Sequence, residues 1–123
     1  MFDHVQIKVS DLQKSRRFYE AVLSQLGFSV VFSGEGVVGI GNSEHDMFEV
    51  RQADNDAPLS AAIHVAFKAG SKESVDKFYI TACALGARDN GSPGFREEYE
   101  TGYYAAFVVD PDGHNLEAVF SSK

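Results

Sequence analysis

Two histidines and two glutamates stand at matching places in short apolar stretches of this sequence. His4 opens HVQIK and His64 opens HVAFK, while Glu49 and Glu117 each lie between apolar neighbours. Because side chains alternate between the faces of a strand, apolar neighbours that face a helix leave these four side chains on the opposite face. Two imidazoles and two carboxylates suit a divalent ion such as Zn²⁺, Ni²⁺, Co²⁺, Mn²⁺ or Fe²⁺. The pattern therefore predicts a metal centre with His4, Glu49, His64 and Glu117 as ligands.

The other acidic and imidazole residues near these stretches do not share the pattern. A single histidine or glutamate on a strand is usually solvated or satisfied by a neighbour, so only the matched set carries the prediction. Asp3 and His114 fall out of phase with the four candidate ligands, and His45 lies in the turn SEHD. We expect Asp3, His45 and His114 to be surface groups.

The first half of the chain has the hydropathy pattern of one strand, one helix and three further strands. Residues 2–9 alternate between apolar and polar types, which is typical of a half-buried strand. Ser10 or Asp11 offers an N-cap for an amphipathic helix that Gly27 ends. Short β-rich runs follow at 28–32, 37–40 and 47–50, separated by glycine-rich turns.

The second half repeats this plan. A strand at 63–68 precedes a helix capped by Ser71 and ended by Gly86, and further strands are expected at 104–109 and 115–120. The polar, glycine-rich stretch 89–102 is expected to be a long loop. Self-similarity at a fixed spacing determines architecture. We predict an α+β fold in one domain, built from two βαβββ modules at about 1–55 and 60–123.

Composition and charge exclude several classes of protein. The 123 residues carry a formal net charge of −7, with basic residues scattered singly, which disfavours a nucleic-acid partner. No signal peptide and no apolar span of about 18 residues is present, so no membrane partner is expected. The single Cys83 excludes an internal disulfide and favours a reducing compartment. The protein is predicted to be cytoplasmic.

The segment GEGVVG at 34–39 satisfies the pattern of a dinucleotide-binding loop. That loop must open a helix, whose N-terminus binds the pyrophosphate. Here the chain continues as Ile40-Gly41-Asn42, so the segment is predicted to be a hairpin. No nucleophile elbow, phosphate-binding loop or paired-cysteine zinc motif occurs, and covalent catalysis has no support.

Nearly the whole chain resembles the vicinal oxygen chelate superfamily, which includes glyoxalase I, bleomycin and fosfomycin resistance proteins and extradiol dioxygenases. The segment DHVQIKVSDLQKSRRFYEAVLSQLGF resembles the family's opening strand and helix, IHVAFKA its second-module strand, and DPDGHNLEAVF its closing hairpin. The resemblance implies paired βαβββ modules whose curved mixed sheets form a cup around a metal, with the helices outside.

The resemblance also implies a chemistry. His4, Glu49, His64 and Glu117 match the ligand set of glyoxalase I-type members, which chelate a small-molecule substrate through vicinal oxygens on the metal and transfer a proton. Glu117 is the first candidate for the catalytic base and Glu49 the second, because a carboxylate beside a metal can exchange between ligand and proton acceptor. A homodimer is implied too. Whether one centre takes its ligands from one chain or from two stays open.

Departures from the family pattern bear on the substrate. Lys8 and Ala53 stand where glyoxalase I members have the arginine and asparagine that hold glutathione, which argues against glutathione use. Arg51 and a second-half set are the candidate pocket residues for a small polar or aromatic anion. The second-half set is Arg96, Tyr99, Tyr103 and Tyr104.

Two other functions belong to the same resemblance. A non-catalytic binding protein of the bleomycin-resistance kind would sequester its ligand in the same cup without a metal. A dioxygenase would use two histidines and one glutamate, usually on a longer chain, so Glu49 favours lyase or isomerase chemistry.

Overall fold

The computed structural model describes residues 1–122. Within them lie eight strands and two helices in the order βαβββ-βαβββ. The chain falls into two compact units, one spanning Met1–Ala61 and the other beginning at Ala62. No helix among the described residues is long and apolar enough to cross a membrane. The α+β fold of two βαβββ modules is confirmed, while the joining of both modules into one domain stays a prediction.

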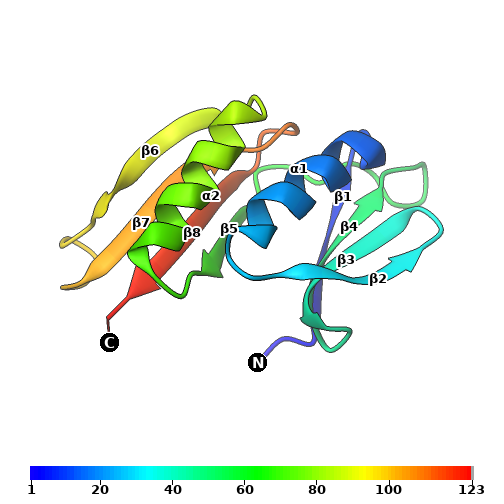
Figure 1. The fold of residues 1–123 in the computed structure, drawn as a ribbon. Coiled ribbons are helices and arrows are strands. Elements are labelled where there is room, and N and C mark those ends of the chain that lie inside the picture. Colours follow the sequence, from blue (N-terminus) through cyan, green and yellow to red (C-terminus); the bar gives the residue numbers. More distant parts are fainter. Residues whose placement is uncertain (123) are drawn as a thin grey trace. The chain divides into compact units, whose positions relative to one another are not determined.

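The first module is a four-stranded mixed sheet with one helix on it (Figure 1). The strands lie in the order β1-β4-β3-β2, and β1 runs parallel to β4, so the first and last strands of the module are neighbours. The elements are β1 His4–Val9, α1 Leu12–Ser24, β2 Ser29–Gly34, β3 Val37–Ser43 and β4 Asp46–Gln52.

Capping residues define the first helix as the sequence predicts. The side chain of Asp11 accepts a hydrogen bond from the backbone N–H of Lys14, and Gly27 adopts a φ of 89° after the last turn. Between them α1 buries an apolar stripe on its sheet, and the ring of Tyr19 contacts Phe48 of β4 at a centroid distance of 5.2 Å. Phe48 therefore faces the helix, and Glu49 faces away from it. We call the sheet face turned away from the helix the distal face.

The second module repeats the arrangement, with the order β5-β8-β7-β6 and β5 parallel to β8. Ser71 caps α2, and Gly86 adopts a φ of 94° beyond its end. Figure 1 shows α2 lying across one face of this sheet. The elements are β5 His64–Lys68, α2 Lys72–Ala84, β6 Arg88–Phe95, β7 Tyr103–Val109 and β8 Asn115–Ser121.

The prediction of a loop from residue 89 to 102 is wrong over its first half. Residues 89–95 belong to β6, which pairs antiparallel with β7 through two register shifts. Such bulges let an edge strand carry glycines and break the alternation of side chains, and Gly91 has a φ of 148° at one of them. The strand had no period-two pattern to detect because all eight of its residues are exposed or half-buried.

The glycine-rich segment at 34–39 is a hairpin, as predicted. It joins β2 to β3, with Gly36 at a φ of 73° in the turn. No helix follows it, so the segment lacks the helix N-terminus that a dinucleotide needs.

Candidate metal centre

The first module brings His4 and Glu49 together on its distal face. Parallel pairing of β1 with β4 sets Gln6 opposite Glu49 and places His4 two residues away on the same face. The His4 Nε2 atom lies 3.9 Å from Glu49 Oε1, and the Gln6 amide donates to that oxygen at 3.1 Å. Glu49 is only 8% exposed, so this carboxylate has little solvation from water.

Asp3 fixes the orientation of the first imidazole. His4 Nδ1 donates to Asp3 Oδ1 at 2.8 Å, because an ionised carboxylate can only accept. The other Asp3 oxygen accepts from His45 Nδ1, also at 2.8 Å. The hydrogen bonds with His4 and His45 lower the pKa of Asp3, and the bond to Asp3 raises the pKa of His4. Asp3 and His45 are exposed as predicted, but Asp3 also directs Nε2 of His4 toward Glu49.

The second module brings His64 and Glu117 together in the same way. His64 Nε2 lies 3.2 Å from Glu117 Oε1, and Glu117 is 3% exposed. His64 Nδ1 lies 3.2 Å from the backbone carbonyl of Asn115, so the ring is held by a main-chain oxygen where His4 is held by a side chain. The ring also stacks on Phe107 at a centroid distance of 6.4 Å.

A tyrosine supplies the hydrogen bond on Glu117 that an amide supplies on Glu49. The hydroxyl of Tyr103 donates a short hydrogen bond to Glu117 Oε2, which leaves Oε1 beside His64. Burial, followed by this hydrogen bond, raises the pKa of Tyr103 to about 12. The phenol therefore remains a donor to the carboxylate over the physiological pH range.

The two modules share one local geometry. In each, an imidazole gives Nδ1 to an oxygen and presents Nε2 to a buried glutamate oxygen. Metal-ligating histidines are commonly held in this way, with the second nitrogen fixed by an outer hydrogen bond. Two buried glutamates also need a positive partner, which a cation would provide. The donor types therefore fit a divalent ion.

Each module supplies only two of these donors. Among residues 1–122 no group of three or more His, Cys, Asp or Glu side chains could hold a metal ion. An ordinary structural or catalytic site uses three or four protein ligands. The union of both pairs into one centre stays a prediction.

The predicted pocket residues of the second module divide between the two faces of its sheet. Tyr103 lies on the distal face with Glu117, and the ring of Tyr99 packs edge-on against it at 5.3 Å. Tyr104 lies on the helical face instead, because its hydroxyl donates to Asp76 of α2 at 2.6 Å. Consecutive residues of a strand point to opposite faces, and the sequence could not show which tyrosine pointed where.

The two predicted arginines are engaged by other parts of their own modules. Arg51 shares the distal face with Glu49 and pairs with Asp54 at 3.5 Å. Arg96 donates to the backbone carbonyl of Ser92 at 2.8 Å, and its guanidinium lies over the Phe107 ring at 5.5 Å. The Phe107 ring therefore has Arg96 and His64 as neighbours.

His114 is not a surface group, contrary to the prediction. The residue is fully buried, and its Nδ1 accepts from the backbone N–H of Ile63 at 3.2 Å. The Asn115 N–H bonds the Ile63 carbonyl, so the turn before β8 holds the chain entering β5 just before His64. His114 Nε2 has no hydrogen-bond partner among the described residues. The turn motif DPDGH gave no periodic signal from which this burial could be predicted.

Comparisons with known proteins agree with this fold. The model of the Glyoxalase/Bleomycin resistance protein/Dioxygenase superfamily matches residues 1–118. A search of the curated proteins gives no match.

Solved structures resemble the chain over nearly its full length. A glyoxalase/bleomycin resistance protein from Albidiferax ferrireducens T118 is 30% identical with a TM-score of 0.86, over 98% of both chains. A family enzyme from Burkholderia phytofirmans PsJN is 20% identical with a TM-score of 0.73, over 96% of both chains. A lactoylglutathione lyase from Agrobacterium tumefaciens is 21% identical with a TM-score of 0.68, covering 98% of this chain and 92% of that one. The last two likenesses show the fold alone. On the family match and the two βαβββ modules, the chain belongs to the Glyoxalase/Bleomycin resistance protein/Dioxygenase superfamily.

Proposed function

We propose that this protein is a metal-dependent lyase or isomerase that moves a proton on a small oxygenated substrate. The observation that carries the proposal is the repeated pair of a fixed imidazole and a buried glutamate, once in each module. His4, Glu49, His64 and Glu117 would hold the metal. A divalent ion there would stabilise the negative charge that develops on a chelated substrate oxygen.

Glu117 is the proposed catalytic base. Its Oε2 is held by Tyr103, and its Oε1 faces His64 and would be the atom that binds the metal or accepts the substrate proton. The Tyr103 hydroxyl keeps the carboxylate oriented while Oε1 changes partners. Glu49 is the second candidate for the catalytic base, because the Gln6 amide and His4 both approach its Oε1.

Glutathione does not belong to the proposed substrate class. Lys8 and Ala53 stand where the resemblance implies the arginine and the asparagine that would hold glutathione. The predicted substrate is a small molecule that reaches the metal through its own oxygens.

Metal retention gives the first test of the proposal. Protein purified without chelator and reconstituted with each divalent ion in turn should retain one preferred metal, and His64→Ala should lose it because one nitrogen ligand is gone. His45→Ala is the matched control, since the His45 side chain is 85% exposed and pairs with Asp3, while its backbone N–H, which bonds Ser43, is kept in the variant. Substoichiometric metal in the wild type, with no change in His64→Ala, would indicate a metal-free binding protein of the bleomycin-resistance kind.

Proton transfer can be measured before the natural substrate is known. Small α-hydroxycarbonyl compounds, incubated in D₂O with the metal-loaded protein, should exchange the hydrogen next to the carbonyl, as followed by proton NMR. Glu117→Gln should abolish the exchange while the fold persists, because the amide cannot accept the proton. Exchange that survives in Glu117→Gln but not in Glu49→Gln would assign the base to Glu49. Oxygen consumption with catechols, supported by Fe²⁺ alone, would instead indicate a dioxygenase.

A further inference from the structure

A cavity of about 370 Å³ lies in the second module. It is lined by Lys68, Ala69, Glu100, Tyr103, Val119 and Ser121. Its volume falls within the range of small-molecule sites, which starts at roughly 300 Å³. All six residues belong to the unit that begins at Ala62, so the cavity is complete within one module.

The cavity opens on the same sheet face as the His64–Glu117 pair. Val119 and Ser121 follow Glu117 at every second residue of β8, and Lys68 lies directly opposite Val119 on β5. Side chains at that spacing point to one face. Tyr103 joins the two places, because it lines the cavity and donates its hydroxyl to Glu117. A ligand in the cavity would therefore extend toward the proposed base.

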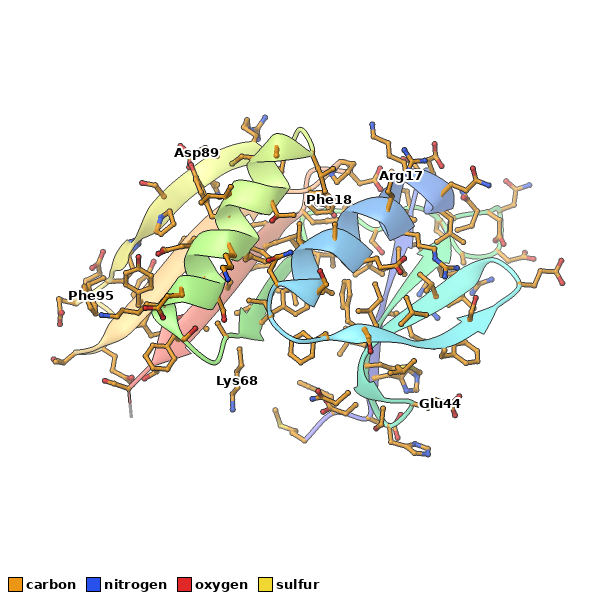
Figure 2. All side chains as sticks on the ribbon, in the orientation of Figure 1. Arg17, Phe18, Glu44, Lys68, Asp89 and Phe95 are labelled. Carbon is orange, nitrogen blue, oxygen red and sulfur yellow. The ribbon has the colours of Figure 1, made fainter. Side chains whose placement is uncertain are left out.

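The residues that line this cavity include one basic and one acidic side chain, Lys68 and Glu100. No ion pair forms between Lys68 and Glu100 or between Lys68 and any other acidic residue of 1–122. Figure 2 labels Lys68, whose side chain projects from β5 into solvent. Glu100 is half-buried, and its Oε1 accepts from the Ser121 hydroxyl at 2.7 Å, which fixes the carboxylate at the cavity wall. Ala69 and Val119 provide apolar surface as well.

We propose that this cavity binds the dipolar end of an amino-acid-like ligand, with its carboxylate on Lys68 and its ammonium on Glu100. A simple anion would meet the repulsion of Glu100, and a simple cation the repulsion of Lys68, whereas a zwitterion satisfies both charges. The aliphatic part of the ligand would contact Ala69 and Val119. As the substrate site of the enzyme this assignment rests on the proposed function, and it names the substrate class as a small zwitterion with oxygens at its other end.

Ligand binding can be measured on metal-free protein, so the result does not depend on the metal centre. The probes are glycine, β-alanine, γ-aminobutyrate and ε-aminocaproate, titrated into labelled protein and followed by NMR shifts. We expect one chain length to bind best and to shift the amides of Lys68, Tyr103 and Ser121. The matching simple carboxylate and simple amine should bind at least tenfold more weakly, a difference of about 1.4 kcal/mol.

Charge-removing variants provide the second half of the test. Lys68→Met and Glu100→Gln should each weaken binding of the best probe about tenfold or more, and Gln keeps the oxygen that accepts from Ser121. Lys77→Met and Glu98→Gln, at exposed positions of the same module, are the matched controls and should bind as the wild type does.

Two results would overturn the zwitterion site: no binding of any probe, or equal affinity for the zwitterion and its carboxylate analogue. Loss of metal retention with probe binding intact would reject the proposed function and leave the cavity assignment standing. Metal retention and proton exchange without probe binding would support the proposed function and reject the cavity assignment.

Discussion

Glu49 and Glu117 occupy equivalent places in the two modules, yet their hydrogen-bond donors differ. Gln6 gives Glu49 an amide that shares the oxygen facing His4, whereas Tyr103 gives Glu117 a phenol on the oxygen turned away from His64. The Glu117 oxygen beside the imidazole is therefore free of the tyrosine. This difference is the physical reason for preferring Glu117 as the base.

The raised pKa of Tyr103 predicts how stability changes at alkaline pH. Its folded pKa of about 12 exceeds the ordinary value of 10.0, so the folded state keeps the phenol proton where the unfolded state loses it. The stabilisation is complete below about pH 10 and is lost as the pH rises toward 12.

Tyr103→Phe should therefore flatten the decline in unfolding free energy between pH 10 and 12. Urea titrations at several pH values measure it. A residual slope is expected, because the pKa of Tyr79 is also raised to about 12. Parallel curves for wild type and variant would contradict the prediction.

His114 is predicted to stabilise the second module. His114→Ala would leave a cavity in place of a fully buried ring and remove the acceptor of the Ile63 N–H. The expected loss in unfolding free energy is about 2–4 kcal/mol, measured by urea denaturation. His45→Ala should leave stability nearly unchanged, because that side chain is 85% exposed. Similar losses in the two variants would show that the buried ring contributes little.

The strands that carry the candidate ligands could be predicted because their periods are clean. Ile7 lies between two polar residues and Phe67 between Ala66 and Lys68, so the face of the histidine in each of these strands follows from its position. β6 could not be predicted, because its bulges interrupt the alternation and its residues bury little. The burial of His114 could not be predicted for a related reason. This residue precedes β8, and there the direction of a side chain depends on the turn.

Two glycines of β3 give a matched test of how closely strands approach the Glu49 strand. A Cβ on Gly41 would collide with the backbone of Asp46 and lie 2.7 Å from Met47 Cα, whereas a Cβ on Gly39 would meet the Met47 sulfur at 2.5 Å. Backbone cannot yield, but a methionine side chain can rotate. Gly41→Ala should therefore lower the unfolding free energy clearly more than Gly39→Ala, as measured by thermal or urea denaturation. The reverse order would show that β3 can shift away from β4 at Gly41.

Across residues 1–122 there are two donor pairs, and neither alone is sufficient for an ordinary metal site. If one centre uses both pairs, the stoichiometry is one ion per chain, and loss of a single ligand removes all the bound metal. His4→Ala should then lose its metal as fully as His64→Ala does, as measured by elemental analysis of the purified proteins. Retention of half the metal in either variant would mean that the pairs bind independently.

A mixed dimer of His4→Ala and Glu117→Ala chains distinguishes a centre within one chain from a centre shared between two. Only a shared arrangement leaves one intact set of four ligands. Recovery of metal in the mixed dimer, with none in either parent, would establish the exchanged form.

The parallel pairing of β1 with β4 and of β5 with β8 has a consequence for biosynthesis. Each donor pair joins the opening strand of a module to its closing strand. The pair of His4 and Glu49 therefore cannot form before β4 is synthesised, and the pair of His64 and Glu117 cannot form before β8 is synthesised. Parallel pairing between strands so distant in sequence is intrinsically slow. A nascent chain on the ribosome carries no complete donor set until β8 has emerged. Metal loading of the proposed centre therefore cannot precede the emergence of β8, and the ions present from that point onward decide which one the centre receives.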